Sequence, residues 1–166
     1  SERLTRAGEL AYRMGPLIRS GPEPWELDLA RPWRLRVRPS GSVSIRFEER
    51  DAEETLVVRD AYAVGVIREF PVTEGHFYEG TVRLSTKVTL GNRTSVQFRW
   101  WGEYDQPLGN NLAIRIPSSP EPVRSTYTVY GYPPPGAVRG ELMIAAVRQA
   151  EGDFLAVEEV ELRAFP

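Results

Sequence analysis

Hydrophobic and polar side chains alternate one by one along most of this chain. Residues 33–38 read Trp-Arg-Leu-Arg-Val-Arg, and residues 94–101 read Thr-Ser-Val-Gln-Phe-Arg-Trp-Trp. Successive side chains of a β-strand point to opposite faces of its sheet, so this period of two indicates strands with one buried and one exposed face. We therefore expect an inward set of Val96, Phe98 and Trp100, and an outward set of Gln97, Arg99 and Trp101.

Roughly nine to eleven such runs follow one another, separated by glycine- and proline-rich turns. Residues 33–38 and 43–47 flank a Pro-Ser-Gly-Ser turn and are predicted to form a hairpin. The acidic residues 48–54 are predicted to be a loop, and residues 77–90 a single long strand.

This spacing predicts an all-β sandwich of two antiparallel sheets over residues 21–166. Residues 1–20 lie outside the alternating pattern and are predicted to form an N-terminal arm or short helix. From residue 25 onward the sequence shows no helical period, so we expect no helix in the sandwich.

Composition and charge exclude several classes of function. The chain has no cysteine, which excludes disulfides, zinc–thiolate sites and cysteine nucleophiles. Its net charge is −2 with both signs interspersed, unlike the basic face of a nucleic-acid-binding protein. No apolar run approaches the about 20 residues that span a membrane, and residues 1–13 contain no apolar segment of a secretory signal.

A catalytic constellation is not evident in the sequence. The single histidine, His76, has no evident serine partner. Adjacent carboxylates such as Glu158 and Glu159 are expected on opposite faces of a strand, where they could not flank one sugar. We therefore expect no enzymatic activity; a glycoside-active enzyme that pairs carboxylates distant in sequence is the less favoured alternative.

Several stretches, in their order and spacing, resemble the jelly-roll carbohydrate-binding modules found beside glycoside hydrolases and in phage tail proteins. They are Gly41–Ile45, Ile67–Tyr78, Val96–Trp101 with Asp105–Gly109, Pro134–Arg139 and Val157–Leu162. The resemblance implies a jelly-roll fold, glycan binding or a role in virion assembly. It also implies a structural calcium ion at Glu158 and Glu159, which stand where the group usually has aspartates.

Outward-facing aromatic residues are the candidate ligand-binding site. Aromatic rings stack on the C–H faces of sugars while neighbouring polar groups bind the hydroxyls. The parity of the strands predicts one exposed platform, made of Trp101, Tyr104, Tyr130, Tyr132, Arg99 and Gln97. Packing of these rings against a loop or a partner subunit is the alternative.

The favoured function is a non-catalytic binding module that serves as a surface component of a larger assembly, such as a phage decoration or tail protein. A free-standing glycan-binding module is the alternative. The expected partners are a glycan or neighbouring protein subunits in an oligomeric assembly, without nucleic acid or membrane. The expected location is extracellular or on a virion surface.

Overall fold

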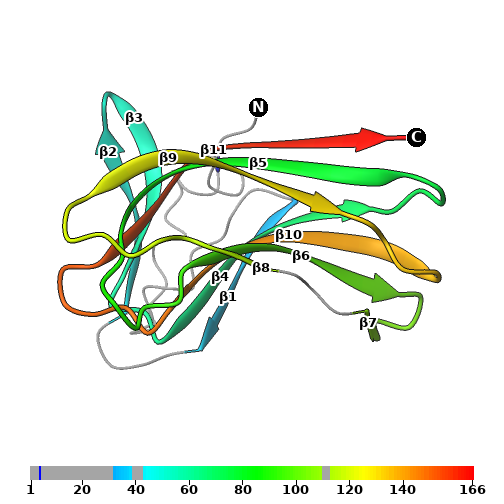
Figure 1. Cartoon of the computed structure of the whole chain (residues 1–166), viewed down its shortest axis with the longest axis horizontal. Coiled ribbons are helices and arrows are strands. Elements are labelled where there is room, and N and C mark those ends of the chain that lie inside the picture. Colours follow the sequence, from blue (N-terminus) through cyan, green and yellow to red (C-terminus); the bar gives the residue numbers. More distant parts are fainter. Residues whose placement is uncertain (1–3, 5–31, 39–42, 110–112) are drawn as a thin grey trace, which may run out of the picture.

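The protein is a sandwich of two antiparallel β-sheets (Figure 1). The computed structural model describes residues 4, 32–38, 43–109 and 113–166. Figure 1 shows the two layers, with β5 and β11 in one and β10 and β6 in the other. In the described part of the chain, no helix has the length and apolarity required to cross a membrane.

Sheet I is the layer that carries the candidate site. Its strands are, in spatial order, β1 (Trp33–Arg38), β4 (Ala63–Pro71), β10 (Ala137–Val147), β6 (Ser95–Gly102) and β7 (Pro107–Leu108), and β8 (Ala113–Arg115) also pairs with β6. Each strand pairs antiparallel with its neighbours.

Sheet II forms the other layer and is also antiparallel throughout. Its strands are, in spatial order, β2 (Ser44–Arg50), β3 (Glu53–Arg59), β11 (Phe154–Phe165), β5 (Phe77–Lys87) and β9 (Val123–Gly131). The predicted all-β jelly-roll sandwich is confirmed.

The core lies between the sheets and is built from the inward set of each strand. On β6, Val96, Phe98 and Trp100 are buried as predicted. The rings of Phe98 and Trp100 pack with the rings of Phe70 and Tyr78 at one end of the sandwich. Glycines leave space for these rings: a Cβ atom at Gly140 would lie 2.3 Å from Phe70 Cζ.

The predicted hairpin of residues 33–47 is wrong. β1 pairs with β4 in sheet I, whereas β2 pairs with β3 in sheet II. Alternation identifies a strand and its buried face, but it does not state which strand lies beside it. Two strands that follow one another in the sequence, β1 and β2, therefore lie in different layers.

The acidic loop predicted at residues 48–54 is also wrong. β2 continues to Arg50 and β3 begins at Glu53, so the two strands are joined by Asp51 and Ala52 alone. Both of these residues have positive φ, 50° and 64°, as a tight two-residue hairpin requires. The strand predicted to end at residue 90 ends at Lys87, and Leu90 is exposed in the turn that follows.

The predicted N-terminal arm lies outside the described residues, apart from Leu4. That side chain is buried in the main core cluster.

Candidate ligand-binding face

The outer face of sheet I is rich in arginine. The outward positions of its strands carry the arginines Arg34, Arg36, Arg38, Arg99, Arg115 and Arg139. Small or apolar residues fill the middle of the same face, on β4 and β10. The face therefore combines a weakly polar floor with many hydrogen-bond donors.

At one end of this face, a network of charged side chains surrounds Trp101. The Trp101 indole N–H donates to Glu141 Oε1 at 2.7 Å, and the Arg34 guanidinium pairs with the other oxygen of the same carboxylate. Arg34 Nε also donates to Glu69 Oε1 at 2.7 Å, and Arg139 binds that oxygen at 3.1 Å. Glu141 is fully buried, so the network holds Trp101 in one orientation.

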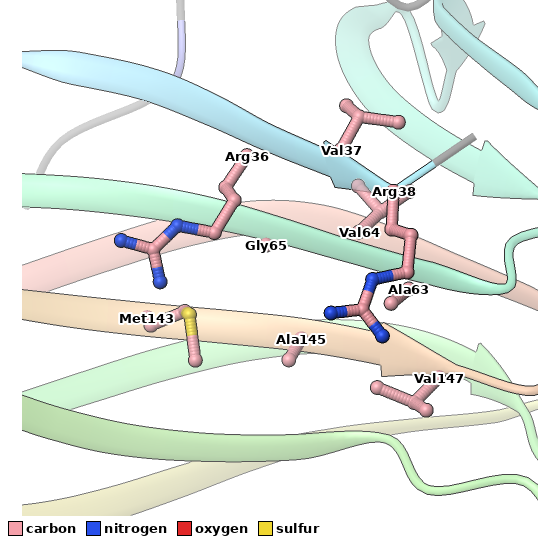
Figure 2. A pocket seen from close by; sticks show the side chains of 9 residues that line it. All are labelled: Arg36, Val37, Arg38, Ala63, Val64, Gly65, Met143, Ala145 and Val147. Carbon is pink, nitrogen blue, oxygen red and sulfur yellow. The ribbon is translucent and has the colours of Figure 1, made fainter.

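Next to this network, a pocket of about 510 Å³ lies over β1, β4 and β10. Figure 2 shows the side chains of Arg36 and Arg38 extending from β1 over β4. The floor contains Ala63, Gly65 and Ala145, together with larger apolar side chains, Met143 and Val147. We call this the arginine-rimmed pocket.

The absence of a side chain at Gly65 shapes the floor. A Cβ atom there would lie 3.0 Å from Met143 Sδ and 3.8 Å from Arg36 Cβ. Met143 therefore leans over the glycine, and its sulfur lies 4.0 Å from Arg99 Nη1 on the other side. Arg99 belongs to β6, and its contact with Met143 places its guanidinium beside the pocket.

Three of the predicted site residues lie on this face. Gln97, Arg99 and Trp101 point outward from β6, as the alternation predicted. The Trp101 ring is only partly exposed, with the guanidinium carbons of Arg99 and Arg139 each 5.3 Å from the ring centroid. Its ring is therefore packed against cations and is not an open stacking surface.

The predicted tyrosines lie elsewhere. Tyr130 belongs to β9 of sheet II, where it is 59% exposed on the outer face opposite Glu79. Tyr132 follows β9 and is 70% exposed, and Tyr104 is 82% exposed in the turn after β6. A single platform of Trp101 with Tyr130 and Tyr132 does not exist, because the two strands belong to opposite sheets.

Tyr132 belongs instead to a row of stacked rings on sheet II. The centroid of its ring lies 5.6 Å from that of Phe77, and the centroids of Phe77 and Phe165 are 5.0 Å apart. The angle between the ring planes is 17° in both pairs. Arg163 covers the last ring at 5.1 Å. Phe77 therefore covers one face of the Tyr132 ring, while the Tyr132 side chain as a whole stays largely exposed. Tyr132 also lines a cleft of about 890 Å³ beside His76 and the residues 133–138.

Several solved structures share this arrangement of sheets at low sequence identity. A family 61 carbohydrate-binding module, TmCBM61, solved with β-1,4-galactotriose, has a TM-score of 0.51 and 12% identity, covering 80% of this chain and 88% of the module. The fold is that of the jelly-roll carbohydrate-binding modules.

Other proteins use the same jelly-roll fold. The enzymatically active domain of bacteriophage CBA120 tailspike protein 4 has a TM-score of 0.64 and 15% identity over 80% of this chain, which spans 19% of the tailspike chain. A Stig cyclase from Fischerella sp. TAU has a TM-score of 0.55 and 12% identity over 82% of this chain and 85% of its own. No protein-family model and no curated protein matches the sequence.

The calcium site implied for this jelly-roll fold does not fit the residues present. Glu158 accepts hydrogen bonds from Ser85 Oγ at 2.7 Å, Arg124 Nε at 2.7 Å and Arg83 Nε at 3.1 Å. A cation would have to displace two guanidinium groups from this carboxylate. Among the described residues, no cluster of three or more acidic or histidine side chains could hold a metal ion.

The same region corrects the expectation that Glu158 and Glu159 point to opposite faces. The pairing of β11 with β5 shifts by one residue between Val157 and Glu159, which marks a β-bulge. Arg83 consequently binds both carboxylates, through Nε to Glu158 and through Nη2 to Glu159 at 3.3 Å.

Sequence reasoning missed the arginine-rimmed pocket. The alternating arginines of β1 were visible, but they are equally typical of a solvated strand face. The floor residues Gly65 and Ala145 are separated by 80 positions in the sequence and meet only through the pairing of β4 with β10. The one available signal was the run of small residues in each of these two strands.

Proposed function

We propose that this protein is a non-catalytic glycan-binding module whose ligand lies in the arginine-rimmed pocket on sheet I. The observation that carries the proposal is the pairing of an apolar floor with arginine side chains along its rim. Pyranose rings present apolar C–H faces and a periphery of hydroxyls, so they bind to surfaces that combine these two features.

Gln97 extends the polar part of this surface. Its position on β6 is directly opposite Met143, so its amide lies beside the pocket floor on the outer face. An amide both donates and accepts, which suits hydroxyl groups that do the same.

The carboxylates on this face support a non-catalytic role. Glu69 and Glu141 are direct neighbours on β4 and β10, and a hydrolase acting on sugars would need such a pair. Glu141 is fully buried and held by Arg34 and Trp101, so it makes no contact with a bound sugar. The pair serves to orient the surrounding side chains.

Two structural neighbours were solved with oligosaccharides, TmCBM61 with β-1,4-galactotriose and the xylanase 10B modules of Clostridium thermocellum with xylohexaose. The second has a TM-score of 0.53 and 15% identity, and this chain spans 25% of its length. The TmCBM61 complex, in which the module stands alone with its oligosaccharide, supports sugar binding on a sandwich of this shape, and it does not identify the sugar here.

The test is a glycan array followed by calorimetric titration. We expect saturable binding of oligosaccharides, lost in Ala63→Trp, which places an indole over the pocket floor. Thr126→Trp places the same ring on the exposed outer face of sheet II and is expected to bind normally. Absence of binding across a broad array, or equal loss in both variants, would overturn the proposal.

A second candidate function is a subunit of a larger assembly, such as a virion. The likeness to a tailspike domain and the exposed rings of Tyr104, Tyr130 and Tyr132 favour it. Sedimentation of the full chain at rising concentration tests the self-assembling form of this proposal. Self-association that Tyr130→Ala and Tyr132→Ala reduce would support it, and a monomer at all concentrations would contradict it.

A further inference from the structure

We infer that the ligand of the arginine-rimmed pocket is an acidic glycan, a polysaccharide with uronate carboxylates that bind Arg36, Arg38 and Arg99. The inference rests on the proposed glycan-binding function and adds the chemical class of the sugar. It comes from the distribution of charge on the outer face of sheet I.

The arginines of this face fall into two groups. Arg34 and Arg139 are neutralised by the carboxylates of Glu69, Glu141 and Asp105. In contrast, no carboxylate of the described residues lies within ion-pair distance of the second group, which contains Arg36, Arg38, Arg99 and Arg115. In a chain of net charge −2, this group forms a local excess of positive charge.

Two arginines of the second group, Arg36 and Arg115, stand at the ends of one row of small residues. Strand register aligns Arg36 with Gly65, Ala145, Ser95 and Arg115 in one row across five strands. The three residues between the arginines have small side chains or none. At about 4.8 Å between adjacent strands, the row spans roughly 19 Å, which gives room for an extended chain of sugars with a cation at each end.

Arg36 and Arg99 also approach each other across Met143. Burial lowers the pKa of the Arg36 guanidinium, the positive charge of Arg99 lowers it further, and the carboxylate of Glu141 offsets only part of this effect. Two like charges beside an apolar floor repel each other in the free protein. An anion bound between them would relieve that repulsion.

Uronate is the anion that matches both parts of the surface. Its carboxylate accepts two parallel hydrogen bonds from one guanidinium, and its ring retains an apolar C–H face for the floor. A nucleic acid would place a phosphate at every residue, and the overall negative charge of the protein disfavours such a polyanion. A polysaccharide with intermittent carboxylates fits better a face on which only some arginines lack a carboxylate partner among the described residues.

The experiment uses the full chain and three uronate polymers, polygalacturonate, alginate and hyaluronan, each beside its carboxyl-reduced form. We expect at least one acid polymer to bind at least about tenfold more tightly than its reduced form. We also expect this affinity to fall as the salt concentration rises from about 0.05 M to about 0.5 M, because ions screen exposed charges.

The double variant Arg36→Gln, Arg99→Gln is expected to lose the preference for the acid form while keeping the weaker binding of the reduced form. Arg46→Gln removes an exposed arginine from sheet II and serves as the matched control. An unchanged thermal transition in both variants shows that the fold is intact.

The outcomes separate the two proposals. Equal affinity for acid and reduced polymers overturns the acidic-glycan inference and leaves glycan binding standing. Absence of binding to any glycan, acidic or neutral, overturns both. If the double variant still prefers the acid form, the carboxylates of the polymer bind elsewhere on the protein, and the inference is overturned as well.

Discussion

Glu141 is the residue on which the candidate face depends most. Its carboxylate is fully buried, yet it touches a cation and an indole N–H that are themselves only partly buried. A buried charge is tolerated when its partners are fixed, and here they fix the residues that border the pocket. The network is therefore a structural support for the face.

We predict that Glu141→Gln lowers the free energy of unfolding by about 1–3 kcal/mol, because the new amide presents a donor to Arg34 or to Trp101. Urea unfolding, followed by tryptophan fluorescence, measures the change. Glu69→Gln alters a carboxylate of the same network that is 32% exposed, and should cost under about 1 kcal/mol. Equal effects of the two variants would contradict the special role of Glu141.

Glu158 supports the opposite sheet in a comparable way. Burial alone would raise the pKa of its carboxyl, but hydrogen bonds from Ser85 and Arg124 outweigh burial and hold that pKa below its usual value. The pKa of the Asp153 carboxyl is lowered in the same way, because hydrogen bonds from Asn92, Ala150 and Thr89 outweigh the effect of its burial. Both carboxylates therefore stabilise the fold in their charged form.

Because the folded state lowers the pKa of both carboxyls, the protein is predicted to lose stability in acid. The contribution of Glu158 is complete above the pKa of an unfolded glutamate, about 4.3, and is lost as the pH falls through the lower folded-state pKa. Urea unfolding at a series of pH values should show it. Glu158→Gln should be less stable than the wild type at neutral pH and lose less stability below about pH 4. Parallel curves for the two proteins would contradict the assignment.

Among the elements, the turn between β2 and β3 carries strain. Asp51 and Ala52 both adopt positive φ, and alanine has a Cβ atom that disfavours this conformation. Aspartate tolerates it better because its side chain can bond the local backbone. Ala52 is therefore the costly residue of the hairpin.

We predict that Ala52→Gly raises the free energy of unfolding by about 0.5–1 kcal/mol, despite the added flexibility of the unfolded chain. Ala164→Gly provides the control, since Ala164 is exposed on β11 outside the positive-φ residues. The free energy of unfolding of Ala164→Gly should fall by about the amount by which that of Ala52→Gly rises. Thermal unfolding of both distinguishes relief of strain from a general effect of glycine.

For the whole molecule, the decisive fact is that the two outer faces belong to different sheets. Trp101 and the arginine-rimmed pocket lie on sheet I, and Tyr130 lies on sheet II. A ligand in the arginine-rimmed pocket therefore does not touch the Tyr130 ring. The proposed glycan site and the proposed protein interface therefore lie on separate faces.

This separation predicts that Tyr130→Ala leaves glycan affinity within about twofold of the wild type, because the core lies between the ring and the pocket. Arg38→Gln, on the pocket rim, should weaken binding of an acid polymer. Calorimetric titration of both variants measures the contrast. A large loss of affinity in Tyr130→Ala would place the ligand on sheet II.

The sequence by itself determined which residues are strands and which of their side chains are buried. Val96, Phe98 and Trp100 are in the core, and Gln97, Arg99 and Trp101 face out, because a period of two is a local property of the backbone. It mistook residues 48–54, which form the ends of β2 and β3 and the tight turn between them, for a loop, and it predicted a hairpin of β1 with β2 that does not form.

Only the tertiary structure decided which outward residues share a face. Tyr130 and Trp101 have the same parity in their strands, but β9 pairs with β5 and β6 pairs with β10. The pocket likewise depends on Arg36, Gly65 and Ala145 meeting across three strands. Strand pairing is a long-range choice set by packing of the whole core, and no local pattern of side chains encodes it.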